Sequence, residues 1–137
     1  MSYCILITSD LVDEQLSLRY SSCDCTILPT AGEGFGFPIV ESLACGTSCI
    51  TTNYAAGPAL VPPACRVMPI AYRVDTIHNV VRAVLDGPSF YRAAVEQVEL
   101  KREQGVYRSH ELSGSVAHLS WDALKYPWTK WLLEGVQ

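Results

Sequence analysis

The fold of this chain is decided by one stretch, Thr30-Ala31-Gly32-Glu33-Gly34-Phe35-Gly36-Phe37-Pro38-Ile39-Val40-Glu41-Ser42-Leu43-Ala44-Cys45-Gly46. The run Thr26-Ile27-Leu28 before it is typical of a short buried strand, and three glycines close behind Pro29 make the chain turn sharply. Pro38 favours the first turn of a helix, because its fixed φ and missing N–H cost nothing there, and Gly46 is a natural helix end. The stretch therefore predicts a strand exit followed by a short, half-buried helix.

The turn combines a phosphate-binding feature with two carboxylates. A glycine-rich turn before a helix presents unpaired backbone N–H groups and the positive end of the helix dipole to an anion. Glu33 in the turn and Glu41 in the first turns of the helix can face the same crevice at the carboxyl end of the strand. Because carboxylates accept hydrogen bonds from hydroxyls, we expect a ligand with both phosphates and sugar hydroxyls, such as a nucleotide sugar. The alternative is an ordinary α/β turn with solvated glutamates.

The string from Glu33 to Gly46, with the following strand Cys49-Ile50-Thr51-Thr52, closely resembles the donor-site segment of retaining GT-B glycosyltransferases of family 4. Those enzymes carry a Glu-x7-Glu signature in the C-terminal one of their two domains. The resemblance implies that Glu33 contacts the hydroxyls of the donor sugar and that Glu41 binds the ribose of the nucleotide. It implies Glu33 as the catalytic residue and a donor-binding set made of Glu33, Gly34, Phe35, Gly36, Phe37, Pro38 and Glu41. It also implies hexosyl transfer with retention and no metal or other cofactor.

Composition narrows the class of protein. The 137 residues are 49% hydrophobic and carry a net charge of -4, which predicts one globular domain over residues 1–137. Ten basic against fourteen acidic residues, without a basic run, do not suit nucleic acid as a partner. No apolar run approaches the roughly 18 residues that a transmembrane helix needs, and no basic segment precedes a hydrophobic leader. We therefore expect a soluble, cytoplasmic protein.

Local patterns predict the other elements in order. The first is a strand over Tyr3 to Thr8, followed by a helix that Ser9 or Asp10 caps and that runs to about Ser22 with Leu16 and Tyr20 on its apolar stripe. Strands follow at Cys25 to Leu28, Ser48 to Thr52 and Arg66 to Ile70, the last two joined by a turn-rich loop over 53–63. The expected fold is α/β, a partial Rossmann-like three-layer domain with a mostly parallel sheet, as in the C-terminal half of a GT-B fold.

The C-terminal half reads as helical. Asp75 to Leu85 has an amphipathic pattern that Asp86-Gly87-Pro88 closes, and a second helix spans Ser89 to about Gln104. Small residues from Gly105 to Ser115 then predict a loose connection to a last helix within Leu119 to Leu133, broken by Pro127. The three tryptophans of that helix predict core packing rather than sugar stacking.

Cysteines and histidines add no site. Six cysteines occur without a Cys-x-x-Cys pair, and we interpret them as buried free thiols. The closest pair, Cys23 and Cys25, is an unfavourable candidate for zinc or redox chemistry, and the three histidines lack partners for a triad or a metal. We therefore expect no metal.

Two features of the family that this chain resembles have no counterpart in its sequence. The family holds the donor diphosphate with an Arg and a Lys from earlier strand-helix units, and Arg19 is the only basic residue before the motif here. Ala59 stands where many relatives place a glutamate. The chain is then a fragment of a longer enzyme, one of two subunits with an N-terminal glycosyltransferase half, or a catalytically inactive nucleotide-sugar-binding or regulatory remnant. An unpaired apolar strand at Tyr3 to Thr8 would also favour self-association.

Overall fold

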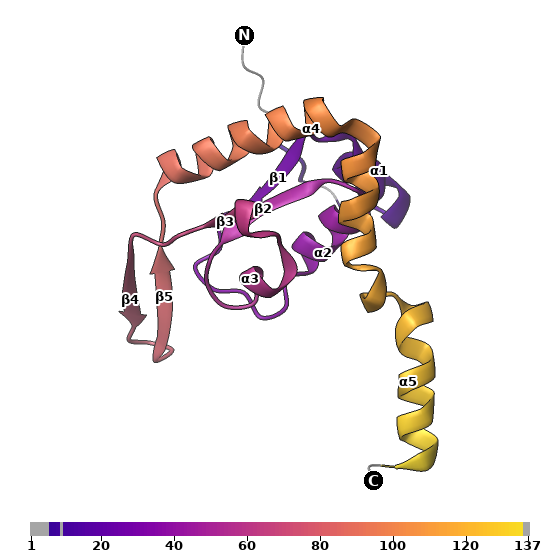
Figure 1. Cartoon of the computed structure of the whole chain (residues 1–137). Helices are drawn as coiled ribbons and strands as arrows, with labels where there is room; N and C mark the ends of the chain where they lie inside the picture. Colours follow the sequence, from indigo (N-terminus) through magenta and orange to yellow (C-terminus); the bar gives the residue numbers. More distant parts are fainter. Residues whose placement is uncertain (1–5, 9, 136–137) are drawn as a thin grey trace.

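Three parallel strands form the central sheet of the chain, for which the computed structural model describes residues 6–8 and 10–135. The strands are β1 (Cys25–Leu28), β2 (Ser48–Thr52) and β3 (Arg66–Val67), in the order β1-β2-β3 (Figure 1). Cys25 lies opposite Ser48, and Thr51 lies opposite Arg66. β2 is buried along its whole length, as expected for the central strand of a sheet covered on both faces.

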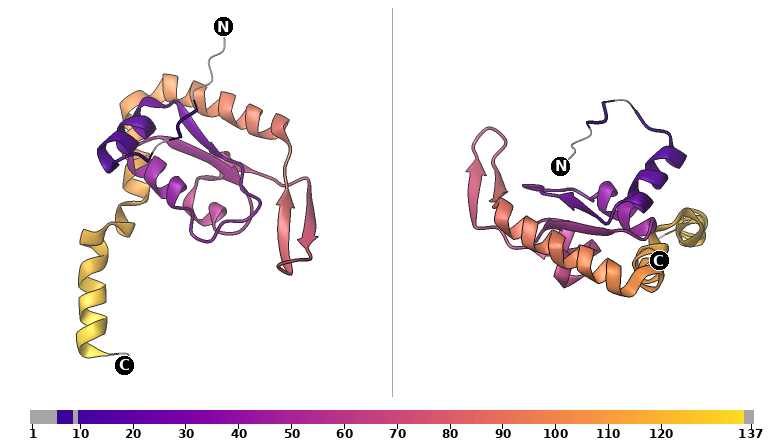
Figure 2. Two further views of the ribbon diagram at one scale, coloured as in Figure 1. Left: turned by 180° about the vertical axis from the view of Figure 1, so that it is seen from behind. Right: turned by 90° about the horizontal axis from the view of Figure 1, so that it is seen from above.

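Helices cover both faces of this sheet. Because side chains alternate along β2, Cys49 packs with Ile39 of α2 (Phe37–Ala44), whereas Ile50 packs with Phe90 of α4 (Gly87–Ser115). Figure 2 shows α4 passing across one side of the strands, with α2 and α1 (Asp13–Ser22) on the other. The structure therefore has the three-layer α/β arrangement that the sequence predicted. The remaining helical elements are α3 (Gly57–Leu60), the 3-10 helices η1 (Pro63–Cys65) and η2 (Ala117–Leu119), and α5 (Trp121–Glu134).

Helix α4 is longer than predicted and bends at one residue. Asp86 caps the N-terminus of α4, since its carboxylate accepts the N–H of Ser89 at 2.9 Å. The run Asp86-Gly87-Pro88 therefore starts α4 and does not end a helix before it. At Gly105 the backbone leaves the helical region (φ 53°, ψ -128°), and the helix then continues to Ser115. The predicted loose connection is therefore wrong. The second half of α4 brings Leu112 into the cluster that also contains Ile39, so one bent helix reaches both cores.

The predicted helix over Asp75 to Leu85 is also wrong. The structure has an antiparallel hairpin there, made of β4 (Ala71–Asp75) and β5 (Val80–Val84). Asp75 Oδ1 accepts the N–H groups of Ile77 and His78 at 3.1 and 3.4 Å, and Asn79 adopts φ 49°, which together turn the chain back. Valine favours strands because its branched side chain restricts χ1, and this preference prevails over a helical spacing that occurs by coincidence.

Other bounds differ by smaller amounts. Of the predicted first strand, residues 3–5 lie outside the described residues, and residues 6–8 have no strand structure. α1 begins after Val12 rather than at a cap from Asp10, and Ser9 is outside the described residues. β3 ends at Val67 instead of Ile70, and the predicted loop after β2 contains α3.

The tryptophans do not pack into the core. α5 extends away from the sheet (Figure 1), and the exposed fractions of Trp121, Trp128 and Trp131 are 84%, 54% and 51%. Trp128 and Trp131 contact each other edge to face, with ring centroids 5.7 Å apart. Pro127 lies inside α5 without ending it. The prediction of core packing is therefore wrong, and α5 presents an apolar aromatic surface.

The cysteines of the described residues differ in burial, and Cys4 lies outside those residues. Cys49 and Cys65 are buried, and burial raises the pKa of the Cys65 thiol to about 11. Cys25 and Cys45 are half-buried and Cys23 is exposed, so the prediction of buried thiols is confirmed only in part. Over 6–8 and 10–135, no three His, Cys, Asp or Glu side chains gather as a metal site would require, and no helix has the length and apolar character to cross a membrane.

We expect the isolated chain to self-associate as its concentration rises. Among the described residues no strand pairs with the outer edge of β1, and α5 exposes Trp131 and its apolar neighbours. Light scattering over a concentration series should show dimers or larger species. Trp131→Glu should reduce this association, whereas Thr129→Glu, which adds the same charge to α5, should reduce it less. A monomer at every concentration would contradict the prediction.

Candidate functional site

The turn after β1 is fastened to the carboxyl end of the sheet. Thr52 Oγ1 on β2 donates a hydrogen bond to the carbonyl oxygen of Thr30 at 2.7 Å. Thr30 Oγ1 in turn accepts the N–H of Gly32 at 3.1 Å, which folds the start of the turn onto itself. The glycine-rich stretch therefore begins where open α/β sheets bind their ligands.

Gly36 is required at the start of α2. Its φ is 92°, and a Cβ at this position would lie 2.9 Å from Ile39 Cδ1 and 3.2 Å from Leu60 Cδ1. Its carbonyl oxygen accepts the N–H groups of Ile39 and Val40 at 2.9 and 3.2 Å, and Pro38 lies in the first turn. The predicted strand exit and short helix are confirmed. Gly34 has open space where a Cβ would be, so it faces outward.

The side chains of the turn differ in burial and in the groups that they contact. Glu33 is half-buried, and its Oε1 accepts the N–H of Gly34 at 3.1 Å. The rings of Phe35 and Phe37 are exposed, with centroids 5.1 Å apart. They line an apolar groove of about 380 Å³ together with Val40, Leu119, Trp121 and Leu124.

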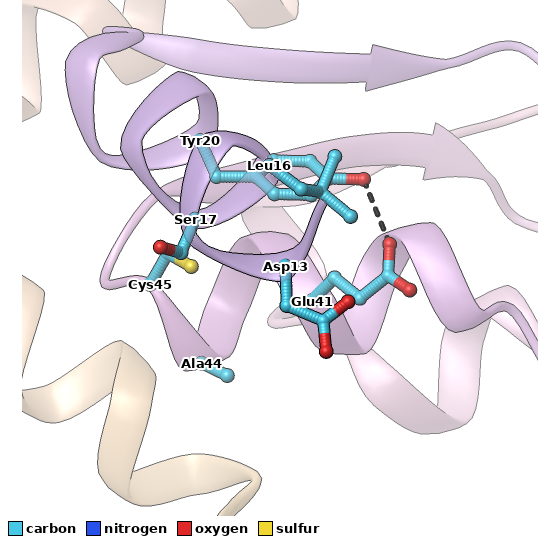
Figure 3. Close-up of a pocket in the computed structure, with 7 residues that line it drawn as sticks. All are labelled: Asp13, Leu16, Ser17, Tyr20, Glu41, Ala44 and Cys45. Carbon is cyan, nitrogen blue, oxygen red and sulfur yellow. Dashed lines mark hydrogen bonds between the residues drawn. The ribbon is translucent and has the colours of Figure 1, made fainter. Parts of the chain in front are cut away.

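Glu41 faces a pocket of about 330 Å³ between α1 and α2. The residues that line the pocket are Asp13, Leu16, Ser17, Tyr20, Glu41, Ala44 and Cys45 (Figure 3). The hydroxyl of Tyr20 donates a hydrogen bond to Glu41 Oε2 at 3.0 Å. Desolvation, followed by the hydrogen bond and charge of Glu41, raises the pKa of Tyr20 to about 12, so the phenol keeps its proton at neutral pH. Glu33 does not line this pocket, so the expected common crevice is not formed here.

One cation lies beside the turn. The Ala83 N–H of β5 donates to the carbonyl oxygen of Ala31 at 3.0 Å, which places the hairpin against the glycines. Arg82 Nη1 lies 3.5 Å from the position that a Cβ of Gly32 would take, and its Nε lies 3.8 Å from Asp75 Oδ2. Sequence reasoning missed Arg82 because it assigned this segment to a helix.

Tyr20 was also missed as a site residue. The available signal was a helical stripe that contains Leu16 and Tyr20, but a stripe alone does not reveal what the tyrosine hydroxyl contacts. Taken together, the site presents backbone N–H groups, two carboxylates, one phenol and one guanidinium. Such a set can accept hydrogen bonds from hydroxyls and attract an anion.

Comparison with known proteins finds a matching family and several relatives. Residues 5–99 match the family model described as glycosyl transferases group 1. An MMP alpha-(1->4)-mannosyltransferase of Mycolicibacterium hassiacum is 32% identical over 59% of this chain and 20% of its own length. A serotype-specific mannosyltransferase WbdA of Escherichia coli is 27% identical over 86% of this chain and 14% of its own length.

This chain therefore spans one fifth or less of these two relatives. No solved structure matches the chain. The matched range contains the whole central sheet, the glycine-rich turn, Glu33 and Glu41, and it covers more than half of the 137 residues. The chain belongs to the family of glycosyl transferases group 1.

Proposed function

We propose that this chain carries the donor half-site of a retaining, family 4-like GT-B glycosyltransferase that takes a hexose from a nucleotide-diphosphate sugar. The observation that carries the proposal is the glycine-rich turn at the carboxyl end of β1, which leads through Gly36 into α2 with one glutamate on each side. The two relatives named above are mannosyltransferases, which supports mannose as the hexose. We propose cytoplasmic action without a metal or another cofactor.

Each glutamate has its own part of the donor in this proposal. Glu33 accepts hydrogen bonds from the hexose hydroxyls, and Glu41 accepts them from the ribose. The backbone from Gly34 to Gly36 lies along the sugar and the diphosphate, with Phe37 and Pro38 setting the start of α2. In the reaction, the bond between the anomeric carbon and the diphosphate oxygen breaks, and its electron pair leaves with the nucleoside diphosphate. The acceptor hydroxyl oxygen bonds to the same face of that carbon, and its proton passes to the departing phosphate oxygen.

The departing diphosphate builds up negative charge, which fixed cations or hydrogen-bond donors must offset. The start of α2 contributes only dipole-strength stabilisation, about 0.3 to 2 kcal/mol. Arg82 is the cation beside the turn among the described residues, and it shares its charge with Asp75. We therefore propose that the remaining cations and the acceptor site come from an N-terminal glycosyltransferase half, in the same or a second chain.

The second candidate is a catalytically inactive nucleotide-sugar-binding or regulatory subunit. The observation that favours it is this small number of cations beside the turn, because binding a donor needs less charge compensation than expelling its diphosphate. The two candidates predict different transfer activities when an N-terminal glycosyltransferase half is added. A half-site gains transfer activity in its presence, whereas a regulatory subunit changes the activity of a partner that is already complete.

We expect the purified chain to bind nucleotide sugars but to transfer nothing from them. Calorimetry with uridine and guanosine diphosphates and their hexose conjugates measures binding, and release of nucleoside diphosphate in the presence of acceptor sugars measures transfer. Gly36→Val, which places branched atoms where Ile39 and Leu60 already lie, should abolish binding. Gly87→Ala, at the start of α4 with open space where its Cβ would lie, should preserve it. Turnover by the chain alone would contradict the half-site, and failure to bind any of these ligands would contradict the proposed function.

A further inference from the structure

The hydrogen bond between Tyr20 and Glu41 joins two elements that are 21 residues apart in the sequence. Tyr20 lies near the C-terminal end of α1, and Glu41 lies in the middle of α2. Figure 3 shows the phenol hydroxyl of Tyr20 pointing at the carboxylate of Glu41. The donor is neutral and the acceptor is charged, so this is the stronger, charge-assisted kind of hydrogen bond.

The tyrosine is held from its backbone as well. Thr47 Oγ1 donates to the carbonyl oxygen of Tyr20 at 2.8 Å, and Thr47 is buried between α2 and β2. The N–H of Cys23 donates to the same carbonyl oxygen at 3.1 Å and ends α1 there. The backbone of Tyr20 is therefore tied to the segment that follows α2, the helix that carries Glu41.

The pocket itself suits a neutral group with hydroxyls. A carboxylate has two acceptor oxygens, and the bond from Tyr20 to Oε2 of Glu41 leaves Oε1 with both of its lone pairs for the hydroxyls of a ligand. Asp13 adds a second carboxylate, and no Lys or Arg is among the lining residues. Two acids without a cation repel phosphate but accept hydrogen bonds from sugar hydroxyls. Leu16 and Ala44 add apolar surface to the lining.

We propose that Tyr20 is a positioning residue, which holds the Glu41 carboxylate in one orientation so that its second oxygen meets the hydroxyls of the ligand. This inference rests on the proposed function, in which Glu41 binds the donor nucleotide. A free glutamate side chain loses rotamer entropy when it binds a ligand, and a carboxylate that is already oriented avoids most of that cost. Tyr20 touches the ligand only through Glu41 in this arrangement.

Tyr20→Phe tests the inference because it removes only the hydroxyl and keeps the ring. We expect the affinity of the full chain for uridine or guanosine diphosphate to fall about three- to tenfold, the cost of ordering one free glutamate side chain on binding. Tyr91→Phe is the matched control, since that side chain is exposed on α4 and its hydroxyl has no hydrogen-bond partner among the described residues, and it should leave the affinity unchanged. Thermal unfolding of both variants shows whether the fold is intact.

A double-mutant cycle separates positioning from a structural role. In a Glu41→Gln background the charged acceptor is gone, so adding Tyr20→Phe should cost much less than it does in the wild-type chain. A structural role would give the same loss in both backgrounds. If the wild-type chain binds and Tyr20→Phe binds equally well, or if the two losses are equal, the inference is overturned while the proposed function stands.

Ionisation of the phenol gives a readout that needs no ligand. In the wild-type chain the pKa of Tyr20 is raised to about 12, partly by the Glu41 charge, so Glu41→Gln should lower it toward the ordinary value near 10. The phenolate absorbance of each chain, minus that of its Tyr20→Phe counterpart, measures this. An unchanged pKa would overturn the inference. If Glu41→Gln lowers the pKa of Tyr20 as expected but the wild-type chain binds neither diphosphate, the proposed function is overturned, and with it the role of Tyr20.

Discussion

Glu41→Ala is expected to weaken binding of a nucleoside diphosphate and of its sugar conjugate alike, by about tenfold to a hundredfold, in the chain combined with its N-terminal half. Glu33→Ala should leave the bare nucleotide nearly untouched and impair only the sugar conjugate by a similar factor. The physical reason is that a hydrogen bond to a charged group contributes about 1.5 to 3 kcal/mol. The two carboxylates lie in different surroundings, Glu41 against α1 and Glu33 within the turn, so they meet different parts of one ligand.

Calorimetry with both ligands on both variants measures this division of roles. Glu99→Ala is the control, because it removes an equal charge from the exposed surface of α4, and it should change neither affinity. Equal losses for the bare nucleotide in the Glu33 and Glu41 variants would show that the assigned roles are wrong.

Gly46→Ala should reduce the free energy of unfolding by about 2 to 4 kcal/mol, because it combines backbone strain with overpacking. Gly46 has φ 74°, and a Cβ there would lie 2.8 Å from Ser109 Cβ and 3.1 Å from the Ser109 carbonyl oxygen. Ser109 belongs to the second half of α4, so relief would require the helix to move away from α2 and β2.

Urea unfolding followed by circular dichroism measures the loss. Gly114→Ala is the matched control, since Gly114 lies within α4 with nothing within 4 Å of its Cβ position. It should stabilise the chain by about 0.5 to 1 kcal/mol, the ordinary helix preference of alanine over glycine. The same small effect at both positions would contradict the packing described for Gly46.

The sequence predicted the central part of the fold because its signals are local. β1, α2 and β2 are marked by a β-branched run, a proline and glycines that act within a few residues, and the structure agrees with their bounds. The hairpin could not be predicted in this way. Ile77, Val80, Val81 and Val84 fit a helical spacing as well as a strand, and the Asp75 carboxylate that turns the chain acts through its specific hydrogen bonds.

The site shows the same division. The spacing predicted that Glu33 and Gly36 lie in the turn and Glu41 in the helix after it, but the common crevice expected for the two glutamates is not formed. Tyr20 and Arg82 could not be predicted, because each reaches the site through a tertiary contact, one by the packing of α1 on α2 and the other by the hairpin against Ala31. The prediction that Trp121 packs in the core failed for a related reason. A large apolar side chain can be buried in its own core or stay exposed on the surface, and the sequence alone does not decide between the two.

The bend at Gly105 has a consequence for how the chain can diverge. One helix contributes to the hydrophobic clusters on both faces of β2, with Phe90 before the bend and Leu112 after it. The last buried residue of these clusters is Val116, and the half-buried Leu119 packs at their edge. α5, which follows Ser120, contributes no buried residue to this hydrophobic interior. We therefore expect members of this family to vary the length and the surface residues of α5 without disturbing the packing beneath α4. Selection can then act on the two segments separately.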